Sequence, residues 1–266
     1  MIPTSTIDTL QQCWHSLSEL GAQLAEGEWQ QATDLPGWTV KDNLSHLVAV
    51  ERMLEGMPPT DHRASAHDHV RNDIGAMNEN EVDARRGLRG GAVLAEWNDL
   101  VVRRLATLRS ADDDYFAQPM LTPTGPGTLA DFLSIRVLDC WLHEQDMRRA
   151  VGRPGNMSGP AAEHTVDRLI RTIPIVVGKR AATPEGAAVV IDIEGPVRRH
   201  LVYEVSGGRA GAIDTPTAPP IASIALGTEA FVVLAAGRRG ADAVDARVEG
   251  DAELARRILT QFNMMI

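Results

Sequence analysis

The hydrophobic pattern of the chain changes its period near the segment VGRPGNMSGP, at residues 151–160. Before this segment, apolar residues recur every three or four positions, as they do on the buried face of an amphipathic helix. After it, short runs rich in β-branched residues alternate with helical stretches. The sequence therefore predicts two domains, a helical domain over residues 1–155 and a smaller α+β domain over residues 156–266.

The first domain is expected to contain four main helices that form a bundle. Two of them begin with the same signal, a threonine N-cap followed three residues later by aspartate: Thr39 with Asp42, and Thr128 with Asp131. The segment at 110–127 is too rich in proline and glycine to stay helical, so a loop is predicted there. The predicted helices cover about residues 7–24, 40–54, 93–108 and 128–151.

The second domain is expected to open with a helix after residue 160. The runs AAVVIDIEGP and RRHLVYEVSGGRA then predict a β-hairpin with a glycine-containing turn. A short strand at 221–226, a helix capped by Thr228, a strand at ARVEG and a final helix at DAELARRILTQF complete the predicted α+β domain.

Charge and hydropathy exclude two classes of partner. The formal net charge of −10 argues against nucleic acid, because affinity for a phosphate backbone comes from clusters of lysine and arginine. We expect a cytoplasmic protein without a membrane partner, since about 18 consecutive apolar residues occur nowhere and the first residues do not resemble a signal peptide. We expect a monomer or a homodimer. Cys13 and Cys140 lack the pairing of a disulfide framework or zinc finger and are predicted to be free, packed thiols.

The most informative helix is TLADFLSIRVLDCWLHEQDMRRAVG, because ionisable residues share a face with core residues there. At about 100° per residue, Arg136, Asp139, His143 and Asp146 fall on one strip. Burying such groups costs several kcal/mol unless they are paired or bind a metal. Asp139 and His143 are four residues apart, so their side chains can converge on one point.

A third metal ligand would have to come from a facing helix, and His46 is the best candidate. It lies at the border of an apolar face that includes Leu44 and Leu47. Two imidazoles and one carboxylate suit zinc, and equally nickel, cobalt, iron or manganese. The alternative is an Asp139–His143 ion pair with His46 as a hydrogen-bonded core histidine. Spacing alone leaves both open.

Other candidate residues carry weaker signals. The segment TDHRASAHDHV contains His62, His67 and His69 without a fixed helical spacing, which favours a solvated loop over a second metal site. Arg238 follows a predicted helix whose negative C-terminal end attracts a cation, so a capping role is the simplest interpretation.

Several stretches together resemble the mycothiol-dependent maleylpyruvate isomerase family: LPGWTVKDNLSHLVAVE, NENEVDARRG, the helix ending in D-x-x-x-H-x-x-D-M-R-R-A-V-G-R-P, and VEGDAELARRIL. The resemblance implies a DinB-like four-helix metal-binding domain followed by a domain similar to sterol-carrier folds. It implies that His46, Asp139 and His143 hold the metal. The chain departs from the isomerases at Asp139, where they characteristically have glutamate.

The resemblance further implies an enzyme that uses a divalent metal, zinc before others, and mycothiol as the thiol cosubstrate. Its partners would be this low-molecular-weight thiol and a small electrophile, and its activity that of an isomerase or an S-transferase. Asp146 would accept a hydrogen bond that orients a ligand, unless it is a helix-surface charge, and Arg238 would bind a substrate carboxylate. Two alternatives stay open: a non-catalytic protein that binds an apolar ligand, and a thiol-independent metal hydrolase.

Overall fold

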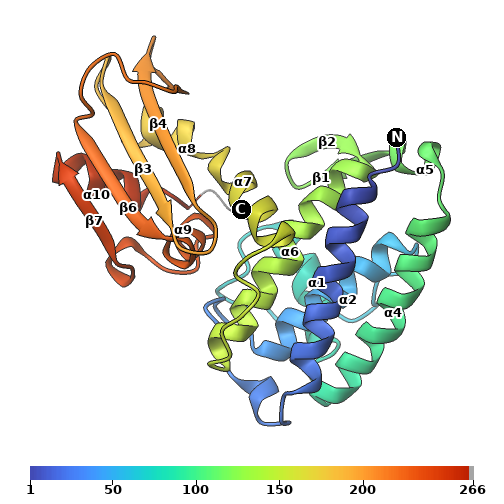
Figure 1. Ribbon diagram of the computed structural model, residues 1–266. Helices are drawn as coiled ribbons and strands as arrows, with labels where there is room; N and C mark the ends of the chain where they lie inside the picture. Colours follow the sequence, from blue (N-terminus) through green and yellow to red (C-terminus); the bar gives the residue numbers. More distant parts are fainter. Residues whose placement is uncertain (264–266) are drawn as a thin grey trace. The chain divides into compact units, whose positions relative to one another are not determined.

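The computed structural model describes residues 1–263 and divides the chain into two compact units, one over residues 1–156 and a second that begins at Met157 (Figure 1). A helical N-terminal region is followed by a sheet domain, as the change of hydrophobic period predicts. Among the described residues no helix is long and apolar enough to span a membrane.

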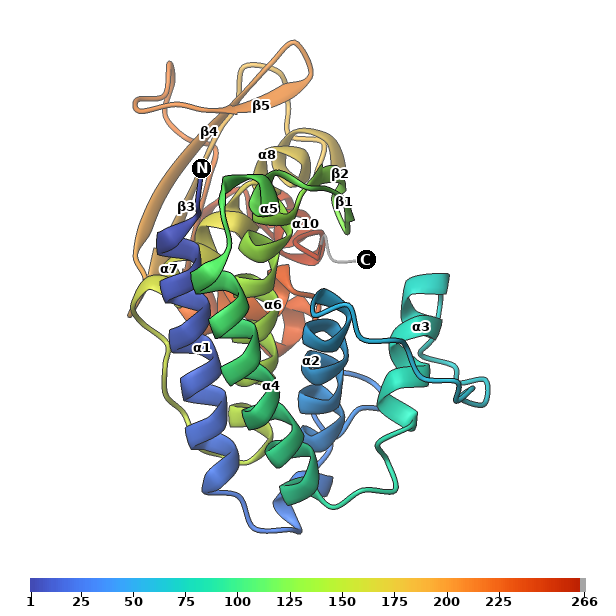
Figure 2. The same cartoon turned by 90° about the vertical axis from the view of Figure 1, so that its right-hand side faces the viewer.

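Four long helices form the first unit, as far as the structure describes it: α1 (Thr4–Ala22), α2 (Val40–Leu54), α4 (Gly90–Ser110) and α6 (Leu129–Ala150). Helices α1 and α2 each contact both α4 and α6 (Figure 2). The side chains between them are large and almost fully buried, and they include Trp14, Leu44, Trp97 and Trp141. This packing brings α2 and α6, which carry the predicted metal ligands, against each other.

Both predicted capping boxes are present and fix where α2 and α6 begin. The Thr39 hydroxyl accepts from the backbone N–H of Asp42, and the Asp42 carboxylate accepts from the backbone N–H of Thr39. Thr128 and Asp131 make the same two bonds. Each N-cap stabilises its helix by about 0.5–2 kcal/mol, so the register of both ligand-bearing helices is set locally.

Three segments of the first unit differ from the prediction. The expected loop at 110–127 instead contains a short helix, α5 (Asp113–Ala117), and a hairpin of β1 (Pro119–Thr122) with β2 (Gly125–Thr128). Gly125 has a φ of +113°, which allows the tight hairpin turn. Helix α3 (Asp73–Asp83) was not predicted, because within it only Glu79 and Val82 are buried and the amphipathic pattern is weak. A short 3₁₀ turn also forms at Glu28–Gln30.

The second unit is built on a five-stranded sheet of order β5-β4-β3-β6-β7. Strands β3 (Ala188–Glu194) and β4 (Arg199–Ser206) form the predicted antiparallel hairpin, whereas β3 and β6 (Ala222–Gly227) are parallel. Helices α9 and α10 both contact β6. The remaining elements are α7 (Pro160–Ile170), α8 (Ile173–Ile175), a π-helical turn (Val176–Arg180), β5 (Arg209–Ala212), α9 (Thr228–Ala235), a 3₁₀ turn (Ala241–Ala243), β7 (Ala246–Gly250) and α10 (Ala252–Thr260).

The predicted capping role of Thr228 is wrong. Strand β6 continues to Gly227, so Gly227 occupies the N-cap position of α9 and no side chain caps that helix. The Thr228 hydroxyl instead accepts from the backbone N–H of Val197 at 3.1 Å and lies 2.8 Å from the carbonyl oxygen of Glu194. It therefore joins the end of β3 to the loop that follows.

Candidate metal centre

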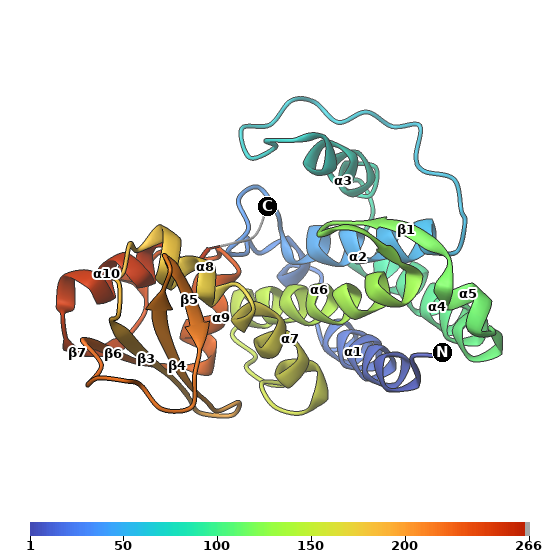
Figure 3. The same ribbon diagram turned by 90° about the horizontal axis from the view of Figure 1, so that it is seen from above.

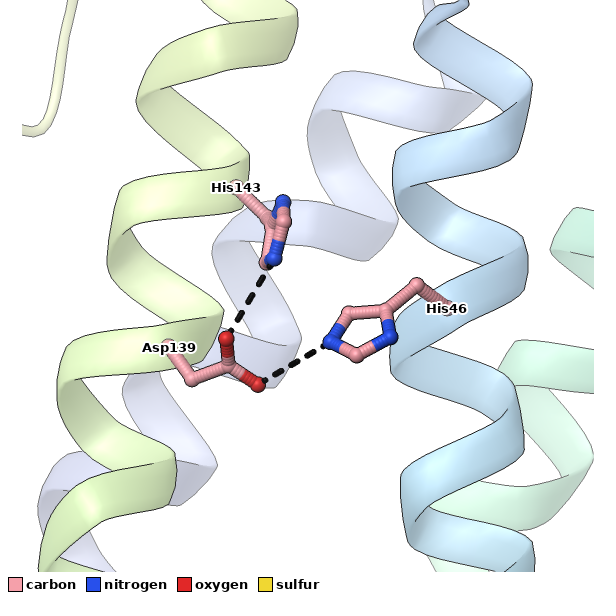
Figure 4. A group of neighbouring side chains, drawn as sticks. All are labelled: His46, Asp139 and His143. Carbon is pink, nitrogen blue, oxygen red and sulfur yellow. Dashed lines mark ion pairs between the residues drawn. The ribbon is translucent and has the colours of Figure 1, made fainter. Parts of the chain in front are cut away.

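Three ionisable side chains converge between α2 and α6: His46 from α2, and Asp139 and His143 from α6 (Figure 4). His46 Nε2 lies 3.4 Å from Asp139 Oδ2, and His143 Nε2 lies 3.3 Å from Asp139 Oδ1. We call these three residues the candidate metal centre. They are the predicted metal ligands, and the structure brings them together.

The two helices run antiparallel past the candidate metal centre. As residue numbers rise along α2 they fall along α6, because Asn43 contacts His143, His46 contacts Asp139, and further along α2 a glutamate contacts Arg136. The side chain of Asp139 is 27% exposed, whereas His46 and His143 are buried. The centre is therefore open at its Asp139 end.

The spacing of the ligand atoms fits a small divalent cation. Nitrogen and oxygen ligands about 2.0–2.2 Å from a tetrahedral zinc ion lie roughly 3.3–3.5 Å from one another. His46 approaches Asp139 Oδ2 and His143 approaches Asp139 Oδ1 at this separation. With one ligand atom taken from each residue, all three atoms lie within 4.8 Å of one another. Within residues 1–263, no other group of three histidine, cysteine or acidic residues meets the same criterion.

A hydrogen bond to Asn43 fixes the orientation of His143. The Asn43 side-chain N–H₂ donates to the carbonyl oxygen of Thr39 at 2.9 Å, so its oxygen faces His143 Nδ1 at 2.6 Å. Because that oxygen can only accept, His143 Nδ1 carries a hydrogen. In the neutral imidazole, Nε2 then presents a lone pair to the Asp139 carboxylate. Two acceptors facing each other favour a cation between them, and a second proton on His143 is the alternative.

The protonation states of the other two ligands also suit a metal. Burial lowers the pKa of His46, which favours the neutral imidazole with a free lone pair. Burial alone would raise the pKa of Asp139, but the neighbouring Arg136 and His46 bring it well below its ordinary value. A neutral imidazole and an ionised carboxylate are the forms that coordinate metals. His46 differs from His143 in that its Nδ1 is buried without a hydrogen-bond partner in the described chain.

An ion-pair network lies behind Asp139. Arg136 contacts Asp139 and pairs with Glu51 at 3.0 Å, while Arg104 pairs with Glu51 at 3.0 Å and with Glu55 at 2.6 Å. Three carboxylates face two guanidinium groups, so the network keeps one negative charge. Because an uncompensated charge is costly in a protein interior, a bound cation would stabilise this arrangement.

Asp146 is more buried than one of its two interpretations expected, and Arg238 makes the expected contact at the end of a helix. Asp146 is only 1% exposed, so the interpretation as a surface charge is wrong. Its carboxylate lies 3.7 Å from His143 Nδ1 and also pairs with Arg149, which leaves an orienting role as a prediction. Arg238 donates to the carbonyl oxygen of Ala236 at the end of α9, as expected of a capping residue. Its contact with a substrate carboxylate stays a prediction.

The loop histidines are not all solvated. His67 and His69 stack on each other, and both pair with the buried Glu79, at 3.6 Å and 3.0 Å. The Trp38 indole N–H donates to the same carboxylate at 2.9 Å. We call Trp38, His67, His69 and Glu79 the Glu79 cluster. The prediction of a solvated loop is wrong for His69, whose side chain is 19% exposed, whereas His67 is 34% exposed. His62 pairs with an aspartate of α3 near the surface.

Trp38 also covers the candidate metal centre. Its ring centroid lies 5.3 Å from that of His46 and 5.9 Å from that of His143. Sequence reasoning missed Trp38 and Asn43, although both belong to the stretch LPGWTVKDNLSHLVAVE.

Cys13 and Cys140 are buried free thiols, as predicted. Burial raises the pKa of Cys140 to about 12, so this thiol stays protonated at neutral pH.

Comparison with known proteins identifies one family, and two similar crystal structures cover most of the chain. Residues 10–148 match the family described as the mycothiol maleylpyruvate isomerase N-terminal domain. The crystal structures are of the mycothiol-dependent maleylpyruvate isomerase and of a histidine-to-alanine mutant of it, with TM-scores of 0.56 and 0.57. Both are 18% identical to this chain, with 91% of each chain covered, which shows a shared fold. No curated protein gives a significant match.

Proposed function

The chain belongs to the mycothiol maleylpyruvate isomerase family, and on this premise we propose that it is a metal-dependent, mycothiol-using isomerase or S-transferase acting on a small electrophile. One observation carries the proposal. His46, Asp139 and His143 converge from two helices with spacings that fit a divalent cation, and the lowered pKa values of His46 and Asp139 favour the forms that coordinate a metal.

The three ligands would hold zinc, and the remaining coordination position would be open to a thiol. When bound, the cation would stabilise the thiolate form of mycothiol over the thiol and so supply a strong nucleophile near neutral pH. Asn43 would keep His143 Nε2 directed at the site, and Arg136 would hold the Asp139 carboxylate. Such supporting contacts typically determine both the affinity and the geometry of a site.

The proposed reaction is a reversible conjugate addition. The thiolate sulfur forms a bond to one carbon of an activated cis double bond, while the π electron pair moves to the conjugated carbonyl oxygen. The former double bond is then single and rotates. In an isomerase the electron pair returns, the carbon–sulfur bond breaks, and the trans isomer leaves with the thiolate regenerated. In an S-transferase, a proton from water completes the adduct, which is the product.

Two further residues have proposed roles. Asp146 lies beside His143 in the interior of the helical unit, where its carboxylate would orient that imidazole or an incoming group. Arg238 would pair with the carboxylate of an acidic substrate, since guanidinium groups bind carboxylates in a bidentate way. Arg238→Lys is therefore expected to raise KM more than it lowers kcat, because lysine keeps the charge and loses the second hydrogen bond.

The test uses cobalt-substituted protein and mycothiol. If the thiolate occupies the open position, a sulfur-to-cobalt charge-transfer absorption appears on addition of mycothiol, and glutathione produces it less readily. The absorption grows as pH rises towards neutrality, because coordination requires the thiol to lose its proton. Metal-loaded protein with neither this absorption nor thiol-dependent turnover of unsaturated acids would contradict the proposal. Hydrolysis without thiol would indicate a hydrolase instead, and co-purified apolar ligand without metal would indicate a binding protein.

A further inference from the structure

A pocket of about 390 Å³ lies in the helical unit beside α2. Residues of α3 and of the segment that joins it to α2 form its other walls. Figure 3 shows this segment running from α2 to α3. This volume falls within the range of small-molecule sites. The walls are mostly apolar and include Ala49, Val50, Met53, Met57, Pro58 and Met77.

The pocket lies further along α2 than the candidate metal centre, and none of the three metal-centre residues lines it. Ala49 and Val50 follow His46 by three and four residues, and Met53 follows it by seven, so all lie on one strip of the helix. At about 1.5 Å per residue, the pocket begins one helical turn beyond His46. Because α6 runs antiparallel to α2, the exposed Asp139 lies towards this end of the centre.

The opposite end of the centre is closed. Trp38 precedes α2, stacks on His143 and lies tilted against His46. Its indole N–H is held by the buried Glu79, which fixes the ring over the two imidazoles. A substrate would therefore reach the open side of the centre from the direction of the pocket.

The rim of the pocket carries a positive charge available for a ligand. Arg63 donates Nη1 to the carbonyl oxygens of Thr60 and His62, and within residues 1–263 no carboxylate lies at ion-pair distance from it. The nearby Glu81 is already engaged, since it accepts from the backbone N–H of Thr60 at 2.6 Å and pairs with Arg85 at 3.2 Å. Arg52 also lines the pocket but pairs with Glu96 at 3.5 Å, which leaves Arg63 as the cationic group for a ligand. Such a pocket complements an apolar body that bears one carboxylate.

The methionines of the pocket are unusually exposed. Met53 is 50% exposed and Met77 is 64% exposed, although such side chains are normally buried. Flexible thioether side chains on a surface adapt to apolar ligands of varied shape. Their exposure on both facing walls, α2 and α3, marks the pocket as a place where apolar surface is left uncovered for a partner.

Building on the proposed function, we propose that this pocket binds the carbon skeleton of the electrophile. The substrate class is an α,β-unsaturated ketone with an aryl or branched alkyl group at one end and a single carboxylate at the other, rather than a compact dicarboxylate. The thiolate sulfur adds to the double bond, the π electrons move to the ketone oxygen, and a proton from water completes the adduct. Arg63 pairs with the carboxylate.

Binding is tested with 4-oxo-4-phenylbutanoate, a saturated analogue that cannot react with a thiol, by titration calorimetry on the metal-loaded protein. Met77→Glu places a negative charge in the pocket and is expected to weaken binding at least about tenfold. Ile74→Glu is the matched control, because Ile74 is 55% exposed on the same helix and does not line the pocket. Equal affinity in the two variants, or no binding to the unsubstituted protein, overturns the proposal.

The role of Arg63 is tested with Arg63→Gln and the control Arg71→Gln, an exposed arginine of the same segment outside the pocket. We expect Arg63→Gln to weaken 4-oxo-4-phenylbutanoate about tenfold and to leave the neutral amide of this analogue unchanged. If Arg63→Gln weakens binding of the acid and of its neutral amide equally, Arg63 does not contact the carboxylate. Each variant must keep the metal content of the unsubstituted protein, so that a change in ligand affinity does not result from loss of metal.

A turnover experiment separates the two proposals. With mycothiol, we expect a higher kcat/KM for cis-4-oxo-4-phenylbut-2-enoate than for maleylpyruvate, and Met77→Glu should remove the difference. The reverse preference overturns the substrate class. If the analogue binds in a Met77-dependent way while no thiol-dependent turnover occurs, the pocket and its ligand class stand, and the proposed enzyme function is the part that fails.

Discussion

The helical unit contains two clusters that each combine two histidines with one acidic residue, and they differ in what surrounds the carboxylate. In the Glu79 cluster, Glu79 accepts from Trp38 and pairs with Arg86 at 2.6 Å as well as with the histidines. Arg86 is also shared with Asp83 at 2.9 Å and with Asp42 at 3.6 Å, so this cluster too has more carboxylates than guanidinium groups. In the candidate metal centre, Asn43 turns a histidine lone pair towards the carboxylate, and the surrounding network keeps a net negative charge.

The comparison teaches that residue type does not define a metal site. The His143 lone pair that Asn43 directs at Asp139 distinguishes the candidate metal centre from the Glu79 cluster, whose carboxylate already accepts from the Trp38 indole N–H and pairs with Arg86. We therefore expect the same residue types to bind a metal in one cluster and to form hydrogen bonds and ion pairs in the other.

The largest difference is expected from removing the histidines. His46→Ala and His143→Ala should each weaken divalent-metal affinity at least about 100-fold, because each removes a direct ligand. His67→Ala and His69→Ala are the matched controls and should keep the metal. Elemental analysis of protein purified without added metal measures both sets. If the His46/His143 double variant still contains a full equivalent of metal, the candidate metal centre does not differ from the Glu79 cluster in metal binding.

A smaller loss is expected from Asn43→Ala. Without the accepting oxygen, the His143 tautomer is no longer fixed, and metal affinity should fall roughly 10–100-fold. Asn43→Asp keeps an acceptor in the same place and should restore most of the affinity. Competition with a chromophoric chelator gives the values. Normal affinity in Asn43→Ala would show that His143 is oriented by other contacts, Asp146 among them.

The Glu79 cluster should contribute to folding stability instead of metal binding. Burial raises the pKa of Glu79, but hydrogen bonds from His69, Trp38 and Arg86 bring it below its ordinary value. A depressed folded-state pKa stabilises the protein at pH values above the unfolded pKa of about 4.3, and this contribution is lost as pH falls through the folded value.

Glu79→Gln should therefore lower the free energy of unfolding of the metal-free protein by about 1–3 kcal/mol at pH 7. The difference from the unsubstituted protein should shrink in acid, below about pH 4. Urea unfolding at several pH values measures it. A difference that is independent of pH would mean that packing, not charge, accounts for the loss.

Asp139→Glu tests how strictly the candidate metal centre depends on carboxylate position. The family resemblance of the sequence implies glutamate at this position in the isomerases, so metal should be retained, with affinity changed less than about tenfold and with altered activity. Asp139→Asn, which removes the charge at constant size, is the control and should lose metal. Loss of all metal in Asp139→Glu would show that the longer side chain does not fit between α2 and α6.

The smallest effect is expected at His62. Its pair with Asp83 measures 2.6 Å, but the His62 side chain is 43% exposed. His62→Ala should change the free energy of unfolding by less than about 1 kcal/mol and leave metal affinity unaltered. Thermal unfolding with and without metal checks both. A substantial loss of metal would show that the loop containing His62 contributes to metal binding, which its contacts do not indicate.

Local signals in the sequence predict much of the helical unit and its ligands. Capping boxes at Thr39 and Thr128 predict where α2 and α6 begin, and the spacing of Asp139 and His143 predicts that they converge. The missed residues act across elements. The role of Asn43 depends on a histidine 100 positions later, and periodicity within one helix carries no information about such a contact.

Helix α3, which was not predicted, buries only Glu79 and Val82 and so has little buried apolar surface of its own. Helix α3 is held largely by polar contacts, such as that of Glu79 with Trp38. The hairpin of β1 and β2 forms where proline and glycine suggested irregular structure, because these residues also suit tight turns. Asp146 was ambiguous for a related reason, since its burial depends on the packing of the whole unit.

The capping boxes have a consequence for how the chain tolerates insertions and deletions. His46 lies seven residues after its cap at Thr39, and Asp139 and His143 lie 11 and 15 residues after Thr128. One residue inserted between cap and ligand would turn the ligand by about 100° and remove it from the cation. The same insertion before the cap would only lengthen a loop. The stretches from cap to ligand therefore behave as fixed-length modules, and length variation among relatives should accumulate outside them.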